Sequence, residues 1–262
     1  MISNSQIDNG QAFDWGRTSD DYAVYRDLYP EEFYQKIIDL GLCVRGQRVL
    51  DLGTGTGVLP RNLYRYGASF VGADISGNQI DAARRLSAAK QMDITYITAA
   101  AEDADFPDQS FDVITACQCF MYFDDAVLVP KMARILAPGG RFAELYLTWL
   151  PEESEIAAKS EELILKYNPA WTGGRFRRIP VTAPAWAGEY FTVENMLAFD
   201  MPVRFTRESW NGRIRACRGI GAALPEDKIW QFEHEHKEML NQTAPESFEI
   251  PHYGTMRVLR VR

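Results

Sequence analysis

The sequence predicts an α/β fold built on a doubly wound, mostly parallel sheet. An apolar run at 49–52 leads into a turn at 53–57 that has glycine at every second position. A second apolar run, at 69–73, ends in an acid. Strand-like and helical segments alternate from 48 to 147, the pattern from which parallel sheets with helices on both faces are built.

The core elements follow from the spacing of the apolar residues. Short continuous apolar runs are typical of buried parallel strands, and apolar residues three and four apart are typical of amphipathic helices. Strands are expected at 48–52, 69–73, 94–98, 111–116 and 141–147, and helices at 57–66, 77–90 and 125–136.

The flanking segments are less regular. A helix is expected at 30–40, because Pro30 and the two glutamates after it suit a helix start. After the core, the sequence predicts helices at 152–167, 207–218 and 225–240, strands at 190–205 and 255–261, and a loop rich in Pro, Gly and Trp at 168–188.

The glycine turn predicts a site for a nucleotide-like cofactor. Glycine lets the backbone approach a ligand closely, and open α/β sheets bind such ligands where a strand meets its helix. Asp51 would repel the pyrophosphate of a dinucleotide but suits a cationic amine. Asp74 follows Asp51 by 23 residues (74 − 51), close to the spacing of an acid that accepts both ribose hydroxyls.

Four motifs in order resemble the class I S-adenosylmethionine-dependent methyltransferases. The segment 51–57 resembles motif I, acid-x-Gly-x-Gly-x-Gly, and 74–76 resembles the acid-hydrophobe-Ser signature. The segment 101–114 is similar to the Ala-Glu-x-Leu-Pro-Phe-x-Asp-x-Ser-Phe-Asp pattern, and 136–142 to the Lys/Arg-Pro-Gly-Gly turn. The resemblance implies a seven-stranded, Rossmann-like sheet whose last strand is antiparallel, with a helical lid or cap.

The resemblance implies S-adenosyl-L-methionine as the cofactor and assigns residues to it. Asp74 would accept the ribose hydroxyls and Ile75 would pack on the adenine, while Gln79 would face either the adenine or solvent. The predicted cofactor-binding residues are Asp51, Gly53, Thr54, Gly55, Gly57, Asp74, Ile75, Gln79, Ala101, Glu102 and Cys117.

Two departures from the family pattern affect these assignments. Ala100 stands where an Asp is common, so the contact to the adenine amine would fall to Glu102 or to the backbone. Met121 stands where many small-molecule members have a histidine, so the sequence identifies no general base and no catalytic residue. Cys117 is expected to line the methionine part, since Cys-x-Cys without a second ligand pair is a poor zinc site.

Candidate substrate residues come from two further segments. The segment 22–30 resembles the Tyr-x-x-x-Arg-x-x-Tyr-Pro entrance segment of small-molecule methyltransferases and contributes Tyr22 and Arg26. The segment 209–215 resembles a Ser-Trp-x-Gly-Arg-x-Arg segment and contributes Trp210 and Arg213. For Tyr22, a place beside the sulfonium and simple packing both stay open. Trp210 and Arg213 are expected to present an aromatic ring and a guanidinium group to the pocket. For the arginines, capture of an anion and surface salt bridging both stay open.

Composition and charge exclude several function classes. The 262 residues carry a net charge of −8, which argues against nucleic acid as a partner. Without an apolar run of 18 residues no membrane span is expected. The four cysteines show no disulfide framework and the N-terminus lacks a signal peptide, so we expect a cytoplasmic protein. No metal is expected, since the histidines of His234-x-His236 do not share a helix face.

The sequence thus predicts one methyltransferase domain over 1–262. It would comprise an entrance segment at 13–42, a cofactor-binding core at 43–147, a lid and substrate region with a core strand at 148–222, and a C-terminal helix with closing strands at 223–262.

The expected reaction is in-line methyl transfer to a small organic molecule, with anionic molecules among the candidates. Two alternatives stay open. One is a non-catalytic regulatory protein that binds S-adenosylmethionine, because no catalytic residue is assigned. The other is an NAD(P)-dependent oxidoreductase, against which Asp51 and the G-x-G-x-G spacing argue. The oligomeric state is left open.

Overall fold

The computed structural model describes residues 2, 4–26 and 29–262, which divide into two compact units. Unit 1 comprises Met1–Leu28, Thr148–Ile179 and Asp200–Tyr253, and unit 2 comprises Tyr29–Leu147, Pro180–Phe199 and Gly254–Arg262. Asp27 and Leu28, which are part of the predicted entrance segment, lie outside the described residues.

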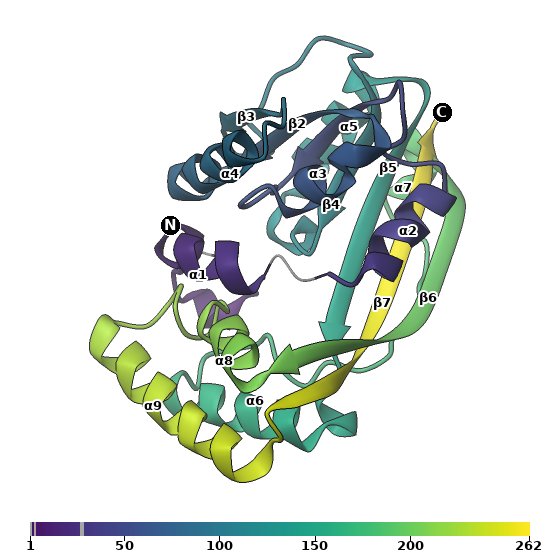
Figure 1. The fold of residues 1–262 in the computed structure, drawn as a ribbon. Coiled ribbons are helices and arrows are strands. Elements are labelled where there is room, and N and C mark those ends of the chain that lie inside the picture. The colour runs from purple at the N-terminus through teal and green to yellow at the C-terminus, as the bar shows by residue number, and fades with distance from the viewer. Residues whose placement is uncertain (1, 3, 27–28) are drawn as a thin grey trace. The chain divides into compact units, whose positions relative to one another are not determined.

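The described residues form one seven-stranded sheet in the order β3-β2-β1-β4-β5-β7-β6 (Figure 1). From β3 to β5 each neighbouring pair is parallel, whereas β7, yellow in Figure 1, runs antiparallel. The predicted sheet is therefore confirmed, including its antiparallel last strand. The strands are β1 (Arg48–Leu52), β2 (Ser69–Asp74), β3 (Thr95–Thr98), β4 (Phe111–Cys117), β5 (Leu136–Trp149), β6 (Phe191–Thr206) and β7 (Ser247–Val261).

The helices begin largely where the sequence places capping residues. Ser76 accepts a hydrogen bond from the Gln79 amide at the start of α4, and Asp124 accepts one from the Ala126 amide at the start of α5. The α-helices are α1 (Ser19–Tyr25), α2 (Glu31–Asp39), α3 (Val58–Leu63), α4 (Gly77–Ala89), α5 (Asp125–Ile135), α6 (Glu155–Tyr167), α7 (Ala187–Tyr190), α8 (Arg207–Arg215) and α9 (Glu226–Thr243).

The predicted start of the last strand, at residue 255, is wrong, because β7 already begins at Ser247. Pro251 and Gly254 resemble strand breakers in the sequence, yet both lie inside β7. The carbonyl of Pro251 accepts a hydrogen bond from the Leu150 amide at 2.9 Å. A Cβ at position 254 would collide with the ring of Phe199, so this glycine is explained by close packing.

The core of unit 2 lies between the sheet and α5. Leu50, Ile114 and Phe142 are fully buried and belong to a cluster that also contains Leu128 and Met132 of α5. These strand residues are consecutive neighbours across β1, β4 and β5. Apolar side chains from these runs of the sequence therefore form the face of the sheet that α5 covers.

Unit 1 is held together by a buried polar network between three helices. Ser160 of α6 contacts His236 Nε2 of α9 at 2.9 Å and accepts a hydrogen bond from Trp210 Nε1 of α8 at 2.9 Å. His236 Nδ1 lies 2.8 Å from Asn211 Oδ1. Ser160 and His236 are fully buried, and burial lowers the pKa of His236 to about 3. The imidazole is therefore neutral at ordinary pH.

Candidate functional site

The glycine turn after β1 has the geometry that the sequence predicts. Gly53, Gly55 and Gly57 have φ of 61°, 55° and 76°, the left-handed region that favours glycine. A Cβ at Gly53 would lie 2.7 Å from Cys119 Sγ, and one at Gly57 would collide with Tyr96. The turn therefore excludes side chains both by its backbone angles and by its packing.

Asp51 is buried near the carboxyl end of β1. It is 2% exposed, and Thr115 of β4, its register partner, donates a hydrogen bond to Asp51 Oδ1 at 2.6 Å. Burial raises the pKa of Asp51 to about 6, while the bond from Thr115 opposes this shift. A cationic group beside Asp51 would stabilise the ionised carboxylate, so the site is suited to an amine ligand.

Asp74, the last residue of β2, is linked to the glycine turn. Its Oδ2 accepts a hydrogen bond from the Gly55 amide at 2.8 Å, and its Oδ1 accepts one from the Ser76 amide at 2.9 Å. Burial raises the pKa of Asp74, and the two amides oppose the shift. A carboxylate held by one bond on each oxygen keeps acceptor capacity on both, which is what a vicinal diol needs.

Ile75 and Gln79 lie in different environments. Ile75 follows Asp74 and is 52% exposed, an unusual position for so large an apolar side chain. Gln79, in the first turn of α4, is 1% exposed, which excludes the predicted alternative that it faces solvent. An exposed apolar residue directly after Asp74 offers a surface on which a planar ring can pack.

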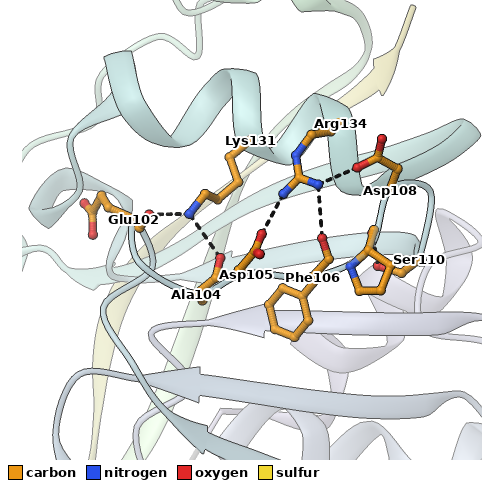
Figure 2. A network of polar contacts seen from close by, with 9 residues as sticks. Glu102, Ala104, Asp105, Phe106, Asp108, Ser110, Lys131 and Arg134 are labelled. Carbon is orange, nitrogen blue, oxygen red and sulfur yellow. Dashed lines mark hydrogen bonds and ion pairs between the residues drawn. The ribbon is translucent and has the colours of Figure 1, made fainter.

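The loop between β3 and β4 is fastened to α5 by two basic side chains (Figure 2). Lys131 donates to the carbonyls of Glu102 and Ala104, the latter at 3.1 Å. Arg134 contacts Asp105 at 2.9 Å, and it also contacts Asp108. The backbone of the predicted adenine loop is thus fixed by side chains of a neighbouring helix.

Ala101 and Glu102 lie at the start of this loop. Ala101 is buried, and one carboxylate oxygen of Glu102 accepts a hydrogen bond from the Asp124 amide at 2.8 Å. This bond joins the loop to the N-terminus of α5. One carboxylate oxygen of Glu102 is therefore already engaged in a hydrogen bond within the protein.

Cys117 ends β4 at the same edge of the sheet as Asp51 and Asp74. Its thiol donates to the Tyr29 hydroxyl at 3.6 Å. Tyr29 in turn stacks on Phe33 of α2, with ring centroids 4.7 Å apart. Cys117 therefore lies beside an aromatic ring of the entrance segment, and its place along the methionine part of the cofactor stays a prediction.

The eleven predicted cofactor residues all belong to unit 2 and follow the carboxyl ends of β1, β2, β3 and β4. Ligands of open α/β sheets bind at this edge, where the strand order reverses between β1 and β4. Sequence reasoning missed Thr115, Lys131 and Arg134. Thr115 is a lone polar residue in the apolar run at 113–116, which is a signal that could have found it.

The four predicted substrate residues all belong to unit 1. The Arg26 guanidinium lies 4.3 Å from the Tyr22 ring centroid and 5.8 Å from that of Trp15. The Arg213 guanidinium lies 5.0 Å from the Trp149 ring centroid. Burial raises the pKa of Cys217, and the charges of both arginines oppose that shift, so the two arginines lie near the same thiol.

Trp210 is a core residue of unit 1. It is fully buried, its indole NH donates to Ser160, and its ring packs against Phe205 at 4.8 Å and Trp149 at 5.6 Å. This position differs from the expected presentation of the ring to a pocket. The helical spacing of the segment is correct, but it describes the buried face of α8.

Most other arginines of the basic segment at 175–218 pair with acids. Arg218 donates to Asp8 at 2.7 Å, and Arg215 pairs with Asp21 and Glu233 at 2.5 Å. Arg178 pairs with Glu153 and with Asp200. The salt-bridge interpretation therefore holds for these three arginines, whose partners mostly lie far away in the sequence.

The two histidines of His234-x-His236 lie in different environments. His234 is exposed and stacks on Trp230, whereas His236 belongs to the buried network of unit 1. Within residues 2, 4–26 and 29–262, no three His, Cys, Asp or Glu side chains gather as a metal site would require. In the same part of the chain, every helix is too short or too polar to cross a bilayer.

Comparisons with known proteins agree with this geometry. The family described as "Methyltransferase domain" matches residues 49–140. The chain is 37% identical to the demethylmenaquinone methyltransferase of Thermus thermophilus over 42% of its length and 52% of that protein. It is 30% identical to the ubiquinone biosynthesis O-methyltransferase of Neisseria meningitidis serogroup C over 60% of its length and 67% of that protein.

A solved structure supports the fold. The YcgJ protein of Bacillus subtilis superposes with a TM-score of 0.55 at 20% identity, over 89% of this chain and all of that one. The chain spans about half the length of the first curated relatives it matches, 52% and 56%. Sequence relatives, fold and glycine turn agree: the chain belongs to the class I S-adenosylmethionine-dependent methyltransferase family.

Proposed function

We propose that the protein transfers a methyl group from S-adenosylmethionine to a small organic acceptor. The observation that carries this proposal is a pair of carboxylates at one sheet edge, of which Asp51 is buried and Asp74 is partly buried. Asp51 suits a cationic amine, and Asp74, held by the Gly55 and Ser76 amides, suits a ribose diol. S-adenosylmethionine carries both groups, and when bound it supplies a methyl group on a sulfonium, a good leaving group.

The residues around these carboxylates fit the remaining parts of this cofactor. The exposed Ile75 side chain offers a surface for the adenine ring, and the loop held by Lys131 and Arg134 provides a fixed backbone beside it. The glycine turn leaves room for close approach, since its backbone excludes side chains at positions 53 and 57. Rate acceleration would come mainly from orientation and from the exclusion of water.

We propose a small anionic molecule as the methyl acceptor. Arg26 and Arg213 support this class, because the guanidinium group of each lies over an aromatic ring of unit 1. Guanidinium groups bind carboxylates and phosphates through paired hydrogen bonds. The net charge of −8 disfavours nucleic acid. A cytoplasmic location belongs to the same proposal, and the absence of disulfides among its four cysteines supports it.

Calorimetric titration with S-adenosylmethionine and S-adenosylhomocysteine, with NADH as the control, tests this proposal. Micromolar binding of the first two but not of NADH is the expected result. Binding of NADH alone would favour the oxidoreductase alternative instead. Binding of S-adenosylmethionine without methylation of any small acid or phenol would favour the non-catalytic regulatory protein.

A further inference from the structure

Unit 2 contains a buried acid, Glu144, within β5. It is 5% exposed, and Arg257 Nη1 of β7 donates a hydrogen bond to its Oε2 at 2.6 Å. Tyr146 lies two residues further along the strand and therefore on the same face. Its phenol lies close enough to the Glu144 carboxylate and to the Met121 amide for both to act on its pKa. Arg257, Glu144 and Tyr146 thus form one polar chain.

This polar chain ends at the edge of the sheet that carries the cofactor residues. Leu145 pairs with Cys117, the last residue of β4, so Tyr146 lies one position beyond the end of that strand. The first turn after β4, which contains Met121, supplies the amide beside Tyr146. Tyr146 therefore lies at the same sheet edge as the predicted cofactor residues, the edge at which open α/β sheets bind their ligands.

Cys119 lies beside the glycine turn and is also affected by the charge of Glu144. Its thiol lies 3.1 Å from the Leu52 carbonyl, and a Cβ on Gly53 would collide with it. Burial raises the pKa of Cys119, and three carboxylates raise it further. These are Asp51, Asp74 and Glu144. Glu144 thus belongs to the same electrostatic environment as the two predicted cofactor carboxylates.

The protonation states suit transfer of a proton along this chain. Burial raises the pKa of Tyr146, so the residue is a neutral phenol beside the Glu144 carboxylate. The phenol oxygen lies beside the Met121 amide and keeps acceptor capacity for one further donor. A hydroxyl group beside Tyr146 could therefore donate to it, while Arg257 holds Glu144 in position.

We propose that Tyr146 and Glu144 receive the proton of a hydroxyl methyl acceptor, with Arg257 as a positioning residue. This inference rests on the proposed methyltransferase function. The acceptor oxygen bonds to the methyl carbon as the carbon–sulfur bond breaks, leaving its electron pair on sulfur. The acceptor O–H bond breaks, and its proton passes to the Tyr146 oxygen as the phenol proton passes to Glu144. Charge and atoms balance without a further reactant.

The test compares two acceptors that differ in whether a proton has to be removed. Phenol is protonated at about pH 8, because its acidity resembles that of a tyrosine side chain, whereas 4-nitrophenol is mostly ionised there. Methyl transfer from labelled S-adenosylmethionine is measured for the wild type, Tyr146→Phe and Glu144→Gln. The matched control is Tyr64→Phe, which removes a phenol bonded to the Asp93 amide of unit 2. Binding of S-adenosylhomocysteine is measured for every variant.

The expected result is a loss of at least about 100-fold with phenol in Tyr146→Phe and Glu144→Gln, within the usual range for general base catalysis. With 4-nitrophenol the loss should stay below about threefold, and S-adenosylhomocysteine should bind every variant equally. Equal losses with both acceptors would show a structural role and overturn the proposal. A wild type that binds S-adenosylhomocysteine but methylates no hydroxyl acceptor, the anionic 4-hydroxybenzoate included, would overturn it too. Failure of the wild type to bind S-adenosylhomocysteine would instead contradict the methyltransferase function.

Discussion

Thr115 donates a 2.6 Å hydrogen bond to the carboxylate of Asp51 across the junction of β1 and β4. The bond is buried, and burial still raises the pKa of Asp51 to about 6. The protein therefore keeps an acid at a site where its ionised form is disfavoured. This relationship determines how stability and ligand affinity should depend on pH.

Asp51→Asn is expected to stabilise the ligand-free protein. The pKa of Asp51 is raised above the unfolded value, so the stability from its protonated form is present below about pH 4 and lost as the pH rises through 6. Asparagine carries no charge, so the substitution removes the cost of burying an ionised carboxylate. The free energy of unfolding should therefore increase by roughly 3 kcal/mol at pH 8 and by about half of that at pH 5. Urea unfolding measures it, with the exposed Asp103→Asn as the control. If the gain in the free energy of unfolding is the same at pH 5 and at pH 8, the ionisation of Asp51 is not its cause.

Affinity for S-adenosylhomocysteine is expected to fall in acid. On the proposed function its amine pairs with the ionised form of Asp51, and the dissociation constant should then rise about tenfold per pH unit below 6. Calorimetry at several pH values measures this dependence. In Asp51→Asn the affinity should be weaker at neutral pH and nearly independent of pH. An equally steep dependence in that variant would assign the titration to another group.

Asp74→Ala is expected to weaken S-adenosylhomocysteine binding by about 1.5–3 kcal/mol, the range for hydrogen bonds to a charged group. The lost bonds are those to the ribose hydroxyls. Asp81→Ala is the matched control, since Asp81 is an exposed acid on α4 that pairs with Arg84. If affinity is unchanged while the circular dichroism spectrum stays intact, Asp74 does not contact the ligand.

Arg213→Ala is expected to raise KM for an anionic acceptor at least about tenfold, or 1.4 kcal/mol, with little change in S-adenosylhomocysteine affinity. Removal of the guanidinium should matter for 4-hydroxybenzoate and much less for neutral 4-hydroxybenzamide. Arg177→Ala serves as the control, because Arg177 is exposed and pairs with Glu152. Weaker binding of S-adenosylhomocysteine together with an unchanged KM for the acceptor would place Arg213 outside the acceptor site.

Unit 1 is expected to lose stability on acidification through His236. Burial lowers the pKa of His236 to about 3, so its contribution is complete above pH 6.5 and is lost as the pH falls below that value. The loss should reach about 2 kcal/mol at pH 5. His236→Gln should flatten this dependence in urea unfolding, whereas the exposed His234→Gln should not. If the free energy of unfolding depends on pH equally in both variants, His236 is not the group whose protonation destabilises unit 1.

The sequence is sufficient to predict the sheet and the glycine turn after β1. The strands that contain Asp51 and Asp74 are short, mostly apolar runs, and all three glycines of the turn have the positive φ that glycine favours. The start of β7 could not be predicted in this way. The Pro251 carbonyl is bonded by the Leu150 amide and Gly254 packs against Phe199, and both of these partners are distant in the sequence.

The substrate side could not be predicted as well, because it depends on long-range pairing. Arg218 is explained by Asp8, which is 210 residues away, so a local count of charges cannot show that it is neutralised. Trp210 has helical spacing that suits a pocket or a core equally. Glu144 and Tyr146 carry a signal in their two-residue spacing on a strand, but their link to Met121 requires the fold.

The fastening of the β3–β4 loop affects how this protein could be re-engineered. The glycine turn accepts no side chain at positions 53 and 57, so its sequence offers little freedom to a designer. The loop that faces the predicted adenine is held by Lys131 and Arg134, which belong to α5. Libraries aimed at bulkier cofactor analogues should therefore vary the helix that anchors the loop and leave the turn intact.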